Sequence, residues 1–145
     1  MDTTPEEIKI FFGNRRIWTN GCYDILHAGH VKLFDYARSL GSELIVGIDS
    51  DRRVRELKGQ GRPINNELDR REVLLANKNI KDVFVFDSPE ELCELIKRYQ
   101  VHTIVVGDEY RDRKVIGEEY CEEVAFFKKI EGYSTTNILD RNSGR

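Results

Sequence analysis

Long apolar runs and an excess of positive charge are both missing from this 145-residue sequence. No stretch approaches the roughly 18 consecutive apolar residues that a membrane-spanning helix needs. The net charge of −3 gives no field that would attract nucleic acid or an anionic membrane. Residues 1–9 are acidic and polar, which is not typical of a signal peptide. We expect a cytoplasmic protein with no nucleic-acid or membrane partner, in which any phosphate is bound by a local site.

Cysteine and proline are also scarce, with three of each. Cys22, Cys93 and Cys121 are too widely spaced for a C-x-x-C metal pair or a disulfide framework, so we expect three reduced thiols. No internal repeat, low-complexity tract or Pro/Gly-rich linker divides the chain. The length predicts one domain over residues 1–145, with its core at about residues 16–141.

Short apolar bursts alternate with segments of helical period. Helix ends are marked by Asn66, by the capping box in Ser88-Pro89-Glu90-Glu91, and by Gly41, which follows a helix that begins near residue 29. The expected strands cover residues 16–19, 44–48, 83–86, 103–106 and 124–127, and a short last helix covers residues 134–141. This alternation predicts the α/β class: a single Rossmann-like domain with a five-stranded parallel sheet and helices on both faces.

In such a sheet, ligands bind beyond the carboxyl ends of the strands, where the strand order reverses. The corresponding loops cover residues 20–30, 49–65, 107–114 and 132–136, and every unusual cluster of residues in the sequence falls within them.

Two of the three histidines, His27 and His30, flank Gly29 at the expected start of the first helix. A helix N-terminus carries about +0.5 of a charge and several free N–H groups, so it suits an anion. Imidazoles there can donate to phosphate oxygens, while Gly29 and Gly21 let a phosphate approach the backbone. A lone histidine is more often a structural residue, and His102 keeps that interpretation. The His-x-Gly-His spacing instead favours a phosphate site.

With this motif, residues 19–31 resemble the H-x-G-H nucleotidyltransferase superfamily, whose members adenylylate or cytidylylate phosphorylated compounds. The run Ser134-Thr135-Thr136-Asn137-Ile138 looks like the family's S-T-T/S-x-I signature, which binds triphosphate at a helix start. Hydroxyls and free N–H groups suit that task, although such a run alone is more often a plain N-cap. The resemblance covers about residues 16–141 and implies transfer of a nucleotide with release of pyrophosphate.

Two subfamilies match best. Residues 19–31 and 57–64 resemble the bacterial heptose 1-phosphate adenylyltransferase domain, whereas residues 30–33 and 106–109 look more like glycerol-3-phosphate cytidylyltransferase. The resemblance implies ATP as the leading donor and a heptose-type sugar 1-phosphate as the acceptor, with CTP and glycerol 3-phosphate as the alternative.

The chain also departs from both patterns. Heptose-type enzymes usually have Lys-Gly-Gly-Asp-Tyr where this chain has residues 105–110, and Asn where it has Asp49. The cytidylyltransferases have an Arg-Thr pair where this chain has Lys129-Ile130. The base and the acceptor are therefore open at the level of sequence.

The resemblance further implies roles for individual residues. The catalytic residues are His27, His30 and Arg70. The nucleotide-binding residues are Asn20, Gly21, Cys22, Gly29, Arg62, Gly107, Asp108, Ser134, Thr135 and Thr136, and the acceptor-binding residues are Asp24, Lys32 and Lys58. A solvated surface charge is the alternative for the Asp and Lys residues among them, as it is for Arg62. No carboxylate cluster suggests a protein cage for a metal, so the expected cofactor is Mg²⁺ delivered with the nucleotide. Analogy with the family predicts a homodimer.

Other functions compete with this interpretation. A non-catalytic nucleotide-binding module would retain the fold without turnover, but both motifs are intact. A synthetase-like fragment that acts on tRNA fits poorly with the net charge of −3 and the short chain. A flavin or pantetheine adenylyltransferase is a nearer alternative. A pyrophosphate-release screen of four triphosphates against phosphorylated sugars and polyols would separate these possibilities.

We predict that the loop Lys58–Asn65 is mobile in the free protein and becomes ordered when nucleotide binds. Gly59 and Gly61 lower the cost of rearrangement, and Lys58 and Arg62 gain partners when phosphates arrive. Hydrogen exchange with and without triphosphate and Mg²⁺ measures this ordering. Equal protection of the loop in both states would count against the prediction.

Overall fold

The computed structural model describes residues 15–128, which form a five-stranded, all-parallel sheet of order β3-β2-β1-β4-β5. The strands are β1 (Arg16–Gly21), β2 (Glu43–Asp49), β3 (Ile80–Phe86), β4 (Thr103–Gly107) and β5 (Glu123–Phe127). The helices are α2 (Ala28–Ser39), α3 (Asp51–Lys58), α4 (Glu67–Leu75) and α5 (Pro89–Arg98), with 3-10 turns η1 (Asp108–Tyr110) and η2 (Glu118–Tyr120). The predicted α/β fold with a five-stranded parallel sheet is confirmed.

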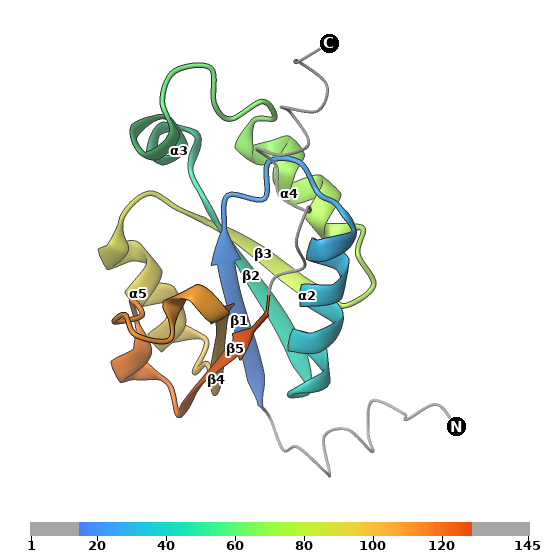
Figure 1. Ribbon diagram of the computed structural model, residues 1–145, viewed down its shortest axis with the longest axis vertical. Helices are drawn as coiled ribbons and strands as arrows, with labels where there is room; N and C mark the ends of the chain where they lie inside the picture. The colour runs from blue at the N-terminus through green and yellow to red at the C-terminus, as the bar shows by residue number, and fades with distance from the viewer. Residues whose placement is uncertain (1–14, 129–145) are drawn as a thin grey trace.

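Helices cover both faces of the sheet, with α2 and α4 on one side and α5 on the other (Figure 1). Successive side chains of a strand point to opposite faces, so neighbouring residues enter different cores. Ile17 of β1 packs with Phe34 of α2 and Leu74 of α4. The next residue, Trp18, packs with Leu92 and Ile96 of α5 on the other face. The central strand is therefore buried on both sides at Ile17 and Trp18.

The strand order reverses between β1 and β4, because β2 and β3 extend the sheet in one direction and β4 and β5 in the other. Both strands end at the same edge, since all pairs are parallel. Three of the four loops singled out in the sequence, residues 20–30, 49–65 and 107–114, begin at this edge. The fourth loop, residues 132–136, and the expected last helix lie outside the described residues.

Helix α3 was not predicted and occupies part of the segment interpreted as the loop 49–65. Its sequence is mostly charged and Val54 is its one buried residue, so it has no apolar stripe. The residues at both ends of α3 are nevertheless typical of helix caps. The Ser50 side chain accepts a hydrogen bond from the Arg53 amide at 3.2 Å, and Gly59 ends the helix at a φ of 96°. No helix within residues 15–128 is both long and apolar enough to cross a membrane.

Candidate functional site

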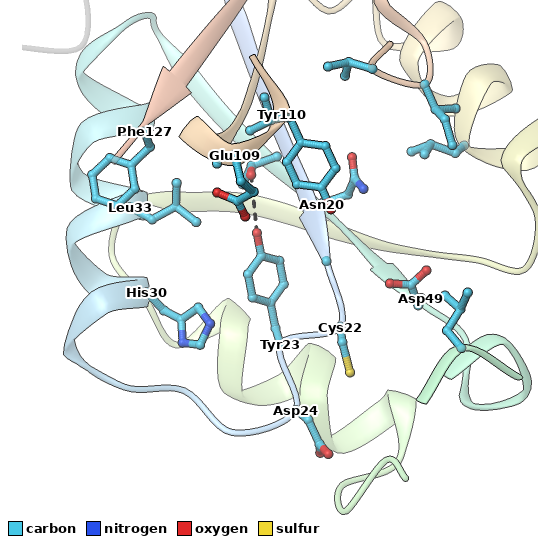
Figure 2. Close-up of a pocket in the computed structure, with 18 of the residues that line it drawn as sticks. Asn20, Cys22, Tyr23, Asp24, His30, Leu33, Asp49, Glu109, Tyr110 and Phe127 are labelled. Atoms are coloured by element: carbon cyan, nitrogen blue, oxygen red, sulfur yellow. Dashed lines mark hydrogen bonds between the residues drawn. The ribbon is translucent and has the colours of Figure 1, made fainter. Parts of the chain in front are cut away.

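A cavity of about 610 Å³ opens at the carboxyl edge of the sheet, where the strand order reverses. Its walls come from the loop after β1, the end of β2 with α3, and the end of β4 with η1 (Figure 2). Most of the predicted site residues line it, namely Asn20, Gly21, Cys22, Asp24, His27, Gly29, His30, Lys58, Arg62 and Gly107. The fold thus brings together residues that lie up to 87 positions apart in the sequence.

His27 and His30 form a reciprocal cap at the N-terminus of α2. His27 Nδ1 accepts a hydrogen bond from the Gly29 amide at 3.1 Å, and His30 Nδ1 accepts one from the His27 amide at 3.2 Å. The ring centroids are 3.9 Å apart. Because each Nδ1 is an acceptor, the proton of each neutral ring lies on Nε2. The spacing of the motif therefore fixes the tautomer of both imidazoles as well as their position.

Tyr23 supports His30 from within the site. Its ring packs edge-on against the rings of His30 and Phe34, with centroids 5.4 Å away in each case. Its hydroxyl lies 3.3 Å from Thr19 Oγ1, which donates to the Val105 carbonyl oxygen (Figure 2 marks the Tyr23 contact). The backbone of Tyr23 has a φ of 50°, in a region that non-glycine residues rarely adopt. The surrounding contacts thus keep this residue in a strained conformation against the histidine pair.

Asp24 connects the first loop to the segment before α4. Its carboxylate, 1% exposed, accepts hydrogen bonds from the amides of Ile64 and Asn65 at 2.7 and 2.8 Å. It also pairs with Arg62 Nε at 3.3 Å. The part of the predicted mobile loop that follows Gly61 is therefore anchored, so we expect ordering by nucleotide mainly over Lys58–Gly61. The proposed contact of Asp24 with the acceptor stays a prediction.

Arg62 lines the cavity and has one donor that is not used. Its Nε is occupied by Asp24, but its Nη2 is buried and has no hydrogen-bond partner among residues 15–128. A buried cationic donor without a partner is costly. A phosphate oxygen that reached this atom would remove the cost, and the contact of Arg62 with phosphate stays a prediction.

Arg70 does not line the cavity, although it was predicted to contact phosphate. Its side chain is fully buried, and its guanidinium donates to the carbonyl oxygens of Cys22, Asp49 and Asn65 at 2.9, 2.8 and 3.0 Å. It also pairs with the Asp51 carboxylate at 2.8 Å. In this arrangement Arg70 positions the loops of the site, and its contact with phosphate stays a prediction.

The other predicted residues lie apart from the cavity or outside the described part. Lys32 is exposed on α2 and does not line the cavity. Asp108 accepts a hydrogen bond from Arg111 Nε at 2.6 Å and is likewise absent from the lining. Ser134, Thr135 and Thr136 lie outside residues 15–128.

Sequence reasoning missed several lining residues. Asp49 and Arg53 form an ion pair with Nε and Oδ1 2.7 Å apart, and Glu109 and Tyr110 of η1 reach the site from above β1 in Figure 2. Asp49 ends a strand at the ligand-binding edge, and Arg53 follows four residues later, which is the spacing of neighbours on a helix. A spacing of four residues indicates contact between side chains only on a helix, and the sequence did not predict α3.

Within residues 15–128, no group of three or more His, Cys, Asp and Glu side chains is arranged to hold a metal ion. The lining carboxylates come from separate segments, and that of Asp24 already accepts from two backbone amides and pairs with Arg62. The expectation that Mg²⁺ arrives with the nucleotide stays a prediction.

Comparison with known proteins gives consistent matches. A family model described as cytidylyltransferase-like matches residues 18–141. Bifunctional protein HldE of Aliarcobacter butzleri is 42% identical over 129 residues, which cover 89% of this chain and 27% of that protein. Its counterpart in Campylobacter fetus subsp. fetus is 41% identical over 132 residues, which cover 91% of this chain and 29% of that protein. The chain thus spans less than a third of the length of these curated relatives.

Solved structures share the fold at lower identity. The lipopolysaccharide core biosynthesis protein from Thermoplasma volcanium has a TM-score of 0.66 and 22% identity, covering 81% of this chain and 100% of that one. Pantothenate synthetase from Thermus thermophilus has a TM-score of 0.52 and 15% identity, and the match covers 89% of this chain and 61% of that one. These two likenesses concern the fold alone.

The buried phenol of Tyr23 predicts a specific loss of stability in alkali. Burial raises the pKa of Tyr23 to about 12, from an ordinary value near 10. The unfolded chain therefore loses this proton first, so the phenol's stabilising contribution is intact below pH 10 and is lost between pH 10 and about 12. We predict that the free energy of unfolding falls more steeply with pH in wild type than in Tyr23→Phe over this window, as measured by urea titration. Tyr120→Phe, at an exposed tyrosine, is the matched control. Identical slopes for wild type and Tyr23→Phe would contradict the assignment.

Proposed function

Because this chain belongs to the cytidylyltransferase-like family of nucleotidyltransferases, we propose that it transfers a nucleoside monophosphate from a nucleoside triphosphate to a phosphorylated sugar or polyol. Pyrophosphate is the second product. The observation that carries the proposal is the His27–His30 pair, which caps the N-terminus of α2 inside the cavity with both Nδ1 atoms accepting from the backbone.

The chemistry needs charge neutralisation and alignment rather than a protein nucleophile. An oxygen of the acceptor phosphate, already ionised at neutral pH, attacks the α-phosphorus of the nucleotide. The new P–O bond forms as the bond from the α-phosphorus to the bridging oxygen breaks, and pyrophosphate leaves with that electron pair. Such transfers are accelerated mainly by positioning and by donors directed at the charged oxygens.

The cavity supplies those donors. The Nε2–H groups of His27 and His30 and the N-terminus of α2 suit the oxygens around the α-phosphorus. The guanidinium of Arg62 and the ammonium of Lys58, which also line the cavity, add positive charge. Gly21 and Gly29 allow phosphate oxygens to approach the backbone. Mg²⁺ delivered with the nucleotide would neutralise part of the phosphate charge.

For the substrates, we propose ATP as donor and a heptose-type sugar 1-phosphate as acceptor. The support is the resemblance of residues 19–31 and 57–64 to the heptose group, which are the longest matches in the sequence. The alternative is CTP with glycerol 3-phosphate, favoured by Lys32 and by Asp108-Glu109. Of these three residues, Glu109 lines the cavity.

The choice of substrates is tested by comparing kcat/KM for ATP plus heptose 1-phosphate with kcat/KM for CTP plus glycerol 3-phosphate. A site that hydrogen-bonds one base edge rejects another by several kcal/mol, so a clear preference is expected. We predict that the first pair is preferred. A preference of tenfold or more for the second pair would reverse the choice, and no pyrophosphate from any of four triphosphates with a panel of acceptors would refute nucleotidyl transfer itself.

We also propose a homodimer, on analogy with the family, and a cytoplasmic location, where nucleoside triphosphates and sugar phosphates are available. Leu68 and Val73 of α4 are 73% and 55% exposed, so this helix offers apolar surface that a second copy could cover. Sedimentation equilibrium measures the oligomeric state directly.

The variant His30→Ala tests the role of the histidine pair. We predict that it folds but loses turnover by about 10²–10³, the scale for removing one donor to a developing charge. His102→Ala is the matched control, because His102 precedes β4 at the opposite edge of the sheet and does not line the cavity. Turnover at the wild-type rate in folded His30→Ala would refute the mechanism.

A further inference from the structure

A second polar pair lines the cavity away from the histidines. Asp49 is the last residue of β2 and Arg53 lies in the first turn of α3, so the pair spans the turn between them. Arg53 Nε is 2.7 Å from Asp49 Oδ1, and the two side chains are 19% and 13% exposed. The Arg53 guanidinium also lies over the Phe86 ring, 5.7 Å from its centroid. The helix spacing and the aromatic ring together fix both groups in place.

Much of the hydrogen-bonding capacity of this pair is unused. Among residues 15–128, the side chain of Asp49 has Arg53 as its hydrogen-bond partner, and no described group accepts from the Nη atoms of Arg53. A carboxylate has about four acceptor sites and a guanidinium five N–H donors. The cavity therefore presents unused acceptors and donors side by side. This combination matches adjacent hydroxyl groups, each of which donates and accepts.

The position of the pair points to one part of the reaction. In Figure 2, Asp49 lies on the far side of Cys22 from His30. The histidines and the α2 N-terminus suit the triphosphate, so the Asp49 side is left for the other substrate. Lys58 is the last residue of α3, the helix that carries Arg53, and it lines the cavity too. An acceptor with a phosphate at one end and hydroxyls along its carbon chain matches this order of groups.

We propose that the Asp49–Arg53 pair recognises adjacent hydroxyl groups of the phosphorylated acceptor and so determines acceptor specificity. This inference rests on the proposed function and names the residues that select its second substrate. The ribose of the nucleotide also carries adjacent hydroxyls, so the test must separate the two sources. If the pair binds the acceptor, removing it raises the KM for the acceptor. If the pair binds the ribose, removing it raises the KM for the triphosphate.

The test compares Asp49→Ala and Arg53→Ala with a matched control, Glu56→Ala. Glu56 of α3 pairs with Arg52, also at a spacing of four residues, but this pair is exposed and Glu56 does not line the cavity. Each protein is assayed by pyrophosphate release with a sugar 1-phosphate and with an analogue that lacks hydroxyls. We expect both cavity variants to raise the KM for the acceptor at least tenfold while the KM for the triphosphate changes less than twofold. The discrimination between the two acceptors, tenfold or more in wild type, should fall towards unity.

Each contrary outcome is decisive. An unchanged KM for the acceptor in both variants overturns the inference and leaves the pair as a structural link between β2 and α3. A rise confined to the KM for the triphosphate assigns the pair to the ribose instead. If an alanine variant does not fold, Asp49→Asn and Arg53→Lys keep the size of the side chains and must shift the acceptor KM in the same direction.

Failure of the proposed function is recognised separately. If wild type releases no pyrophosphate with any acceptor, nucleotidyl transfer is refuted. Calorimetric titration of wild type and Asp49→Ala with the sugar phosphate and its analogue then decides the inference. Binding that is at least tenfold weaker in the variant supports recognition of hydroxyls, and equal binding overturns it.

Discussion

One buried guanidinium, that of Arg70, connects the segments from which the site is built. It donates to the backbone of the first loop at Cys22, to the end of β2 at Asp49 and to the segment before α4 at Asn65, and it pairs with Asp51 of α3. A buried charge is costly unless its hydrogen bonds are satisfied, and removing one member of such a network typically costs about 3–5 kcal/mol. The relative positions of both walls of the cavity therefore depend on this side chain, which itself does not reach the cavity.

Local hydrogen bonds position the rest of the site. The two imidazoles cap α2, so the groups proposed to bind the triphosphate are oriented by the same hydrogen bonds that begin the helix. Asp24 anchors the segment that contains Arg62, whose side chain lines the cavity. The histidine pair and the Asp24 segment are thus organised before any ligand arrives, which lowers the cost of ordering these groups during the reaction.

Sequence predicts most of this arrangement where the signal is local. The apolar bursts placed all five strands, and the helix expected to begin near residue 29 is α2, with His27 and His30 at its N-terminus. Helix α3 was missed because its one buried residue, Val54, leaves no periodic stripe. The position of Arg70 could not be predicted either, since an arginine on a helix after a glycine-rich loop looks the same whether it binds phosphate or four protein oxygens. The contribution of Asp49 and Arg53 depends on the register between β2 and α3, which single-residue patterns do not contain.

The central claim is that His27 and His30 present Nε2–H groups to the triphosphate, and nitrogen NMR of ¹⁵N-labelled imidazoles tests it most directly. Spectra are recorded near pH 8 with and without a non-hydrolysable triphosphate and Mg²⁺, with His102 as the internal reference. We predict that both rings of the free protein carry their proton on Nε2 and that both Nε2 resonances shift on binding while His102 does not. Protonation on Nδ1, or resonances of His27 and His30 that do not respond to triphosphate at saturation, would contradict the claim.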